Sequence, residues 1–417
     1  MKKIKVTHFS YSDIYGGAAR AAYRLNKSLN HVQADKIQSQ MRVIRKGTVD
    51  KNIKQATNRL SPYLSITKSK LSQYVHKFHQ TSNPYTHSYA FFPCKLDIEI
   101  NNSKNDIINL HWVQCEMLSI EAIGRIKKPL VWTLHDTWAF CGSEHYFYGE
   151  DEKRNVEGYN SSNQTNKGFD FDKWCWERKK KNWNKNINIV CPSRWLLNCV
   201  KKSNLMSKFD TYLIPNPLPL DIYKPITKSF ARKIYNLPNE SKLILFGAST
   251  PFSLRKGWDF FLEIVTKISK INPSFEFIVF GMDKPQVESF TNVKIKFLGS
   301  IIDEYALSTL YSSCDVMVLP SRIENLPQCA TEAQACGLPV AAFDCGGISD
   351  VVHNEITGYL AKPFEIDQIV KGIIWILENE ERYEKLSTNS FKTAQRKWNL
   401  KEITKQYLNL YESILEN

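Results

Sequence analysis

The stretch that decides the fold runs from Pro320 to Val352, PSRIENLPQCATEAQACGLPVAAFDCGGISDVV. It follows a short apolar run, residues 316–319, that is typical of a buried parallel strand, and its first polar residues predict a turn. Pro327 suits the first position of a helix, where its missing N–H costs nothing, and Gly337 suits the end of that helix. The sequence therefore predicts a strand, a turn and a helix in direct succession.

Two carboxylates in this stretch are candidate ligand-binding groups: Glu324 in the turn and Glu332 on the helix. Both follow the carboxyl end of a predicted strand, which is where open α/β sheets bind ligands. The helix N-terminus favours a phosphate, and ionised carboxylates accept hydrogen bonds from the neighbouring hydroxyls of ribose and hexose rings. The pattern indicates a nucleotide-sugar site, and the alternative is a pair of solvated surface charges.

The same residues resemble the E-x7-E signature of the retaining family 4 glycosyltransferases. Seven residues separate Glu324 from Glu332, and EAQACGLPV (332–340) and GGISDVV (346–352) also match. The resemblance covers most of the chain. It implies an α/β protein of the GT-B fold, with two facing Rossmann-like domains, a cleft between them and a C-terminal helix that crosses back.

The resemblance also implies roles for four residues of the second domain. Glu324 would hold the donor sugar ring and Glu332 the ribose. The backbone amides near Asn325 and Leu326 would face the pyrophosphate. This assignment comes from the family and not from the spacing of the residues.

Alternating strand and helix patterns occur in both halves of the chain. We predict an N-terminal acceptor domain (1–213), a linker (214–221), a nucleotide-sugar donor domain (222–395) and a C-terminal helix (396–417) that packs back on the first domain. The linker IPNPLPLD contains three prolines, which forbid a continuing helix or a central strand. Residues 45–105 are assigned to the first domain without further detail. The predicted strands are residues 5–9, 106–110, 130–133, 187–191 and 211–214, then 243–246, 275–280, 293–297, 316–319 and 339–343.

The last helix is predicted over residues 401–415. Ile403, Tyr407, Leu410 and Ile414 recur at helical spacing and form one apolar stripe. Such a stripe indicates a helix that buries one face, and in the resembled family this tail crosses back onto the first domain.

The composition of the chain bears on its cellular location and on its need for a metal. The chain has 417 residues, of which 42% are hydrophobic, and no run approaches the ~18 to 20 apolar residues of a membrane span. The N-terminus MKKIKVTHFS reads as a first strand and not as a signal peptide. Ten cysteines are scattered singly, so neither a disulfide framework nor a zinc site is expected. We predict a cytoplasmic protein without a metal or other cofactor.

The positive charge lies in the first half of the chain. Residues 1–218 carry 34 Lys and Arg against 18 Asp and Glu, whereas residues 219–417 carry 22 against 24. A basic acceptor domain suggests an anionic acceptor or peripheral contact with the anionic inner face of the plasma membrane. A nucleic-acid partner is not predicted, because no helix-turn-helix, zinc-finger or RNP-like pattern accompanies the charge.

A glycine pair follows the first predicted strand. Gly16 and Gly17 precede an Ala-rich helix, and two glycines there let the backbone approach a ligand closely. The alternative is a tight turn. The position matches the glycine loop of the resembled family, which lies against the donor phosphates and the acceptor.

Two cations follow the first strand of the second half. Arg255 and Lys256 precede a helix, where fixed positive charge could neutralise a departing pyrophosphate, and the alternative is a solvated basic turn. The resemblance favours Lys256. Many relatives carry a further Arg where Thr250 stands here, and we predict that Arg255 substitutes for it.

Two histidines and an aspartate end predicted strands of the first half. His111 resembles the family histidine that reaches the donor sugar, and the alternative is a satisfied structural histidine. His135 and Asp136 resemble the T-x-H-D strand end of the family. Asp136 is predicted either to orient an acceptor hydroxyl or to hold the imidazole.

Residues 170–172 have the D-x-D form with which another glycosyltransferase fold binds a metal-linked nucleotide. No apolar strand precedes them, so we interpret them as the solvated start of a helix and predict no metal. The adjacent residues 173–186 mix Trp174, Trp176 and Trp183 with a Lys/Arg cluster. This composition suits a membrane interface, or equally a helix docked by its tryptophans with a solvated basic face.

Taken together, these patterns predict a retaining hexosyltransferase that moves a hexose from a nucleotide-sugar to a hydroxyl of a glycan acceptor. The acceptor is predicted to be lipid-linked, in the synthesis of a surface polysaccharide such as lipopolysaccharide or capsule. The alternatives are a nucleotide-sugar-binding protein with a degenerate site and a nucleotide-sugar epimerase of the same fold.

Overall fold

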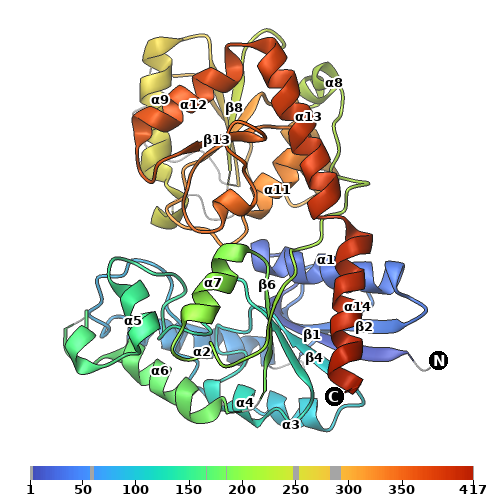
Figure 1. Cartoon of the computed structure of the whole chain (residues 1–417), viewed down its shortest axis with the longest axis vertical. Helices are drawn as coiled ribbons and strands as arrows, with labels where there is room; N and C mark the ends of the chain where they lie inside the picture. The colour runs from blue at the N-terminus through green and yellow to red at the C-terminus, as the bar shows by residue number, and fades with distance from the viewer. Residues whose placement is uncertain are drawn as a thin grey trace. The chain divides into compact units, whose positions relative to one another are not determined.

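The computed structural model describes residues 3–56, 61–165, 167–184, 186–247, 253–281 and 293–416. The chain divides into two compact units, Met1–Pro217 with Lys401–Asn417 and Leu218–Leu400. Each unit is built on one parallel sheet flanked by helices (Figure 1).

The chain passes between the units near the predicted boundaries. The first passage, at Pro217, lies inside the predicted linker, but the return falls at Lys401 and not at residue 396. The reason is that helix α13 (Glu380–Lys397) continues through residue 396. Trp398, just after it, is buried and accepts a hydrogen bond from the backbone N–H of Leu218, at 3.0 Å.

The first unit contains a seven-stranded sheet of order β3-β2-β1-β4-β5-β6-β7, in which all neighbours are parallel. The strands are β1 (Ile4–Ser12), β2 (Ile37–Arg45), β3 (Ile53–Gln55), β4 (Ile107–Leu110), β5 (Leu130–Thr133), β6 (Asn188–Cys191) and β7 (Thr211–Leu213). Five of them lie where the sequence predicted strands. The sequence analysis missed β2 and β3, which extend the sheet beyond β1.

Helices flank this sheet, and the last one comes from the C-terminus. They are α1 (Gly17–Val32), α2 (Ser61–His76), α3 (Leu96–Asn101), α4 (Ile120–Arg125), α5 (Asp151–Glu157), α6 (Phe171–Asn182), α7 (Arg194–Lys202) and α14 (Leu400–Glu416). Tyr407 and Tyr411 attach α14 to the sheet. The Tyr407 hydroxyl lies 3.1 Å from Thr133 Oγ1, and the Tyr411 hydroxyl accepts a 2.8 Å hydrogen bond from Asn109. The C-terminal helix therefore belongs to the first unit, as the resemblance implied.

The second unit contains a six-stranded parallel sheet of order β10-β9-β8-β11-β12-β13. Its strands are β8 (Leu243–Gly247), β9 (Glu276–Phe280), β10 (Ile295–Phe297), β11 (Val316–Leu319), β12 (Val340–Phe343) and β13 (Gly358–Ala361). Its helices include α8 (Lys228–Ile234), α9 (Trp258–Ile271), α10 (Glu304–Ser313), α11 (Gln328–Ala335), α12 (Ile366–Leu377) and α13. The sequence analysis missed only β13 among these strands.

Each sheet has one place where the strand order reverses. In the first unit the chain runs outward from β1 to β3 and resumes at β4 on the other side of β1. In the second unit it runs outward from β8 to β10 and resumes at β11. Crevices at the carboxyl ends of strands beside such a reversal are the usual ligand sites of open α/β sheets. The fold therefore places candidate sites after β1 and β4, and after β8 and β11.

The tryptophan-rich segment is a docked helix. Trp176 and Trp183 are buried, and the indole N–H of Trp183 donates to the carbonyl of Ile120 at 2.9 Å. Lys179 of α6 is also fully buried, and its ammonium group donates to three backbone carbonyls, including those of Trp138 and Gly142. The structure thus corresponds to the docked-helix alternative, with part of the basic cluster inside. Among the described residues, no helix has the length and apolarity to cross a membrane.

Candidate active site

Glu324 lies at the centre of the candidate site of the second unit. It follows β11 and is buried between two cations, with Lys256 Nζ at 2.5 Å from Oε1 and Arg255 Nη1 at 2.9 Å from Oε2. Ser321 also donates to Oε1, at 3.0 Å. Burial would raise the pKa of Glu324, but the two cations lower it to about 2. The carboxylate is therefore ionised at neutral pH, and neither of its oxygens is a solvated surface charge.

Two glycines allow the loops around Glu324 to approach one another. Gly346 has φ +62°, and a Cβ there would lie 2.3 Å from the carbonyl oxygen of Glu324. Gly347 donates its N–H to the same oxygen at 2.8 Å. Gly257 has φ +70°, and its Cβ would lie 1.9 Å from the carbonyl oxygen of Pro320. Both glycines are required by conformation and by space, so Gly257 and Gly346 let their segments pack directly against the loop after β11.

Arg255 and Lys256 lie in a short 3-10 turn, Leu254–Lys256, just before α9. Both side chains are largely buried against Glu324, so the pair is not a solvated basic turn. Arg255 also donates to the carbonyl of Ile323 at 3.0 Å. Thr250, where many relatives carry another Arg, lies outside the described residues. The predicted substitution by Arg255 therefore stays a prediction.

Helix α11 carries the second carboxylate. Glu332 is buried, and its Oε2 accepts a 2.9 Å hydrogen bond from the Tyr311 hydroxyl of α10. The helix begins at Gln328, and Pro327 is its capping residue with ψ 108°, so the prediction of Pro327 as the first helical residue was wrong by one position. Asn325 and Leu326 lie buried in the loop that leads to this helix start. Glu324, the two cations and the N-terminus of α11 thus lie in one part of the unit.

Three histidines form a buried chain of hydrogen bonds in the first unit. His8 of β1 lies 2.9 Å from His111, which follows β4, and His111 lies 3.1 Å from His135, which follows β5. Burial lowers the pKa of His8 to about 3 and that of His135 to about 4, and it places the pKa of His111 well below its usual value. All three rings are neutral at pH 7.

The position of His111 bears on its predicted role. The residue is 2% exposed, and its two ring nitrogens contact His8 and His135. A contact of this ring with a sugar would require one of these bonds to be exchanged. In this structure both ring nitrogens have a partner, and the predicted contact of His111 with a donor sugar stays a prediction.

Asp136 holds an imidazole, but not that of His135. Its Oδ2 accepts from the indole N–H of Trp112 at 2.8 Å and contacts Nδ1 of His145 at 2.5 Å. Burial opposes ionisation of Asp136, but His145 and the other donors lower its pKa. His145 Nε2 in turn lies 2.8 Å from the hydroxyl of Ser88. Asp136, His145 and Ser88 are buried and Trp112 is partly buried, so in this structure Asp136 orients His145 in the loop after β5. The predicted role of Asp136 toward an acceptor hydroxyl stays a prediction.

The glycine pair opens the first helix. Gly16 has φ +99° and caps α1, and a Cβ at this position would meet nothing within 4 Å. Gly17 is the first residue of α1, and no side chain caps this helix. Asp13 anchors the loop by accepting from the backbone N–H groups of Gly47 at 2.8 Å and Thr48 at 2.9 Å. The glycine loop thus leaves open space above a helix N-terminus.

The sequence analysis missed three residues that organise these sites: His8, Ser321 and Tyr311. His8 had a sequence signal: it lies in the predicted strand 5–9, and His111 and His135 follow two other predicted strands of the same half. The contacts of Ser321 and Tyr311 had no sequence signal.

A cavity of about 400 Å³ lies by the starts of β5 and β6, near Leu130 and Asn188. The histidine chain lies at the other end of these strands, away from this cavity.

The two parallel-sheet, Rossmann-like domains define a protein of the GT-B fold. The structure is similar to that of sucrose-phosphate synthase from Thermosynechococcus elongatus, with a TM-score of 0.67, 18% identity and coverage of 99% of this chain and all of the other. Residues 227–393, most of the second unit, match the family model of glycosyl transferases group 1.

Curated relatives resemble part of the chain. An uncharacterized glycosyltransferase of Haemophilus influenzae is 27% identical over 210 residues, which cover 48% of this chain and 56% of the relative. A Campylobacter jejuni enzyme, N,N'-diacetylbacillosaminyl-diphospho-undecaprenol alpha-1,3-N-acetylgalactosaminyltransferase, is 29% identical over 131 residues, or 31% and 34% of the two chains. The chain therefore matches about half or less of the length of these relatives.

Proposed function

We propose that the protein is a retaining glycosyltransferase that moves a hexose from a nucleotide-sugar to a hydroxyl of a glycan acceptor. The observation that carries the proposal is the buried cluster of Glu324, Arg255 and Lys256 at the carboxyl ends of β8 and β11. The family match over residues 227–393 supports it, since this segment includes the whole cluster.

The cluster suits a diphosphate ester of a sugar. Arg255 and Lys256 provide fixed positive charge for a leaving diphosphate, and the N-terminus of α11 provides backbone N–H groups and the positive end of a helix dipole. As the diphosphate binds the cations, the ionised Glu324 becomes available to accept hydrogen bonds from sugar hydroxyls. Glu332, oriented by Tyr311, binds the ribose.

The reaction then needs no protein cofactor. The bond between the sugar C1 and the phosphate oxygen breaks, and the acceptor oxygen forms the new bond to C1. The acceptor proton passes to the departing phosphate oxygen, and a nucleoside diphosphate is released. The positive charges lower the barrier because negative charge accumulates on the leaving group.

The acceptor is proposed to be lipid-linked, and the enzyme to act at the inner face of the plasma membrane. The Campylobacter jejuni relative is named for a diphospho-undecaprenol acceptor. The first 218 residues carry 16 more basic than acidic residues, which favours an anionic acceptor or membrane surface. These two observations favour a glycolipid over a neutral free glycan.

The test is a nucleotide-release assay with UDP-, GDP-, ADP- and dTDP-sugars, with and without detergent-extracted bacterial glycolipids. Release of one nucleotide that rises with the lipid extract is expected, together with a loss of at least about 100-fold in Glu324→Gln. Asp259→Asn is the matched control, because it removes a nearby carboxylate that pairs with Arg322 and not with the cluster.

Three results would contradict the proposal. Donor binding without turnover in folded protein would identify a binding protein. Conversion of the donor alone into an isomeric nucleotide-sugar would identify an epimerase. An inverted anomeric configuration in the product would exclude the retaining mechanism.

A further inference from the structure

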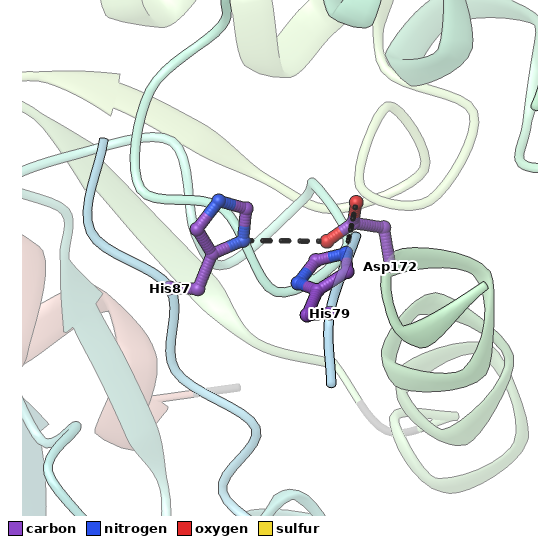
Figure 2. A group of neighbouring side chains, drawn as sticks. All are labelled: His79, His87 and Asp172. Carbon is purple, nitrogen blue, oxygen red and sulfur yellow. Dashed lines mark ion pairs between the residues drawn. The ribbon is translucent and has the colours of Figure 1, made fainter. Parts of the chain in front are cut away.

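We propose that His79, His87 and Asp172 bind a divalent transition-metal ion of the Zn²⁺ class. The three residues lie in the first unit, outside the candidate active site. Their potential ligand atoms all lie within 4.8 Å of one another. Figure 2 shows both imidazole rings turned toward the Asp172 carboxylate, one ring on each oxygen. The sequence predicted no metal, and this cluster is the observation against that prediction.

The distances fit a metal centre. His79 Nε2 lies 3.2 Å from Asp172 Oδ2, and His87 Nδ1 lies 3.5 Å from Oδ1. Two ligands of a tetrahedral Zn²⁺ ion, each bound at about 2.0–2.1 Å, lie roughly 3.3–3.5 Å apart. Two neutral imidazoles and one carboxylate are a ligand set for Zn²⁺ or a similar transition metal, whereas Ca²⁺ and Mg²⁺ prefer oxygen ligands.

Burial makes the cluster different from a surface ion pair. The side chains of His79 and His87 are 0% and 1% exposed, and that of Asp172 is 4% exposed. Residues 170–172 do lie at the start of a helix, as predicted, but the prediction that this start is exposed to solvent was wrong. Asp170 does cap α6, but Asp172 points into the interior because the loop residues 79–87 cover it.

The hydrogen bonds of His87 place a lone pair toward the proposed ion. Its Nε2 lies 3.3 Å from the carbonyl oxygen of Asn83, which can only accept, so this contact favours the tautomer with the proton on Nε2. In that tautomer, Nδ1 presents a lone pair on the side of the Asp172 carboxylate. A hydrogen bond from the remote ring nitrogen to a backbone carbonyl is the usual support of a metal-binding histidine.

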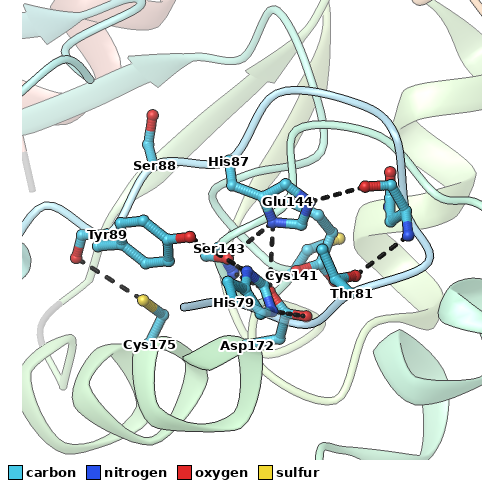
Figure 3. Close-up of polar contacts among 12 residues, drawn as sticks. His79, Thr81, His87, Ser88, Tyr89, Cys141, Ser143, Glu144, Asp172 and Cys175 are labelled. Atoms are coloured by element: carbon cyan, nitrogen blue, oxygen red, sulfur yellow. Dashed lines mark hydrogen bonds and ion pairs between the residues drawn. The ribbon is translucent and has the colours of Figure 1, made fainter. Parts of the chain in front are cut away.

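With the proton of His87 on Nε2, the Ser143 hydroxyl can satisfy only one of its two neighbours. Its hydroxyl lies 2.9 Å from His87 Nδ1 and 2.5 Å from Asp172 Oδ1 (Figure 3). A hydroxyl has one hydrogen, which can be given to the imidazole or to the carboxylate but not to both. A metal ion bound by His87 and Asp172 satisfies both groups and leaves the hydroxyl to bond to one of them or to a metal-bound water.

Acidic and basic side chains surround the cluster. Four buried carboxylates interact in this region, those of Glu144, Asp151, Asp170 and Asp172. They are accompanied by two buried cations, Arg154 and Lys179. Burial and the nearby Asp172 and Asp151 raise the pKa of Glu144 well above its usual value, which favours the uncharged form of that carboxyl. The ion would therefore be bound by Asp172 and the two imidazoles and not by the acidic surroundings as a whole. The ion would hold the loop 79–87 on α6, so its role is structural.

The test measures metal content after any affinity tag has been removed. Protein stripped with EDTA and then given Zn²⁺ or Co²⁺ is expected to retain about one ion per chain and to unfold at a higher temperature. His87→Gln and Asp172→Asn are expected to lose most of the bound ion. His76→Gln is the matched control, because His76 shares the Tyr89 hydroxyl with His79 but is not a proposed ligand.

Two outcomes would overturn the proposal. One is folded wild-type protein that retains neither ion. The other is retention that is unchanged in His87→Gln, which would place the ion elsewhere, for example on the ten cysteines. If the variants do not fold, X-ray absorption of the wild-type protein with Zn²⁺ decides the question. It should show nitrogen and oxygen ligands at about 2.0–2.1 Å and no sulfur at about 2.3 Å.

Discussion

The candidate sites of the two units keep polar groups buried in opposite ways. In the second unit, Glu324 is fully charged and held by Arg255 and Lys256. In the first unit, His8, His111 and His135 are neutral, and each bonds to the next. Glu324, His111 and His135 follow the carboxyl ends of parallel strands, and His8 lies within β1 beside His111. The comparison shows that the same position in a fold can be stabilised by paired charge or by the removal of charge.

The largest effect is expected from breaking the charged set. Glu324→Gln keeps the shape of the side chain but leaves two largely buried cations without their carboxylate. The free energy of unfolding of the second unit is expected to fall by about 3–5 kcal/mol, measured by urea denaturation. Pyrophosphate should restore part of this stability, because it supplies negative charge. Equal stability of the variant and the wild type would show that the ion pairs contribute little.

The second prediction distinguishes the histidine set from the Glu324 set by the pH dependence of the free energy of unfolding. Below about pH 6.5 the buried histidines bind fewer protons in the folded chain than in the unfolded chain. Their contribution to the free energy of unfolding is therefore complete above about pH 6.5. It is lost as the pH falls toward about 4 for His135 and about 3 for His8. Each histidine should cost up to ~1.4 kcal/mol per pH unit in this window. The Glu324 contribution is lost only between about pH 4.5 and about pH 2.

Urea denaturation between pH 7 and pH 5 measures this dependence. His8→Gln should have a shallower slope than the wild type, by about one proton, because it removes one of the three groups. Glu324→Gln should keep the wild-type slope in this range. A slope that His8→Gln leaves unchanged would contradict the assignment of the histidine chain as the source.

The smallest effect is expected from an exposed ion pair beside the charged set. Arg322 pairs with Asp259 at 2.5 Å, and the Asp259 side chain is 52% exposed. Asp259→Asn should therefore change stability by less than about 1 kcal/mol, because solvent screens the pair. A loss comparable to that of Glu324→Gln would mean that burial does not distinguish the two pairs.

Local patterns were sufficient to predict much of the fold. The apolar runs of β8, β11 and β12 are buried on both faces, so they stand out from their polar flanks. The missed strands lack this contrast. β2 alternates buried and exposed residues, and β3 has three residues, of which only Ile53 is buried. β3 is the edge strand and β2 pairs with it, and both bury a smaller share of their residues than the central strand β4.

The part of the candidate site that lies on one continuous segment could be predicted from the sequence. Glu324 and Glu332 lie on a single segment, and the turn and helix around them have local signals. The pairing of Glu324 with Arg255 and Lys256 joins segments 68 residues apart, and the chain of His8, His111 and His135 joins three strands. No local pattern encodes such contacts, because they depend on which strands are neighbours.

The sequence by itself determined the alternation of strands and helices, the linker, the carboxylate loop and the candidate residues, because these depend on the local spacing of apolar residues, glycine and proline. Only the tertiary structure decided which of these groups are charged or neutral, and that Asp172 faces two histidines and not solvent. The physical reason is that protonation and ligand geometry depend on burial and on neighbours far away in the chain. A carboxylate has the same side chain in every sequence, but its surroundings decide what it does.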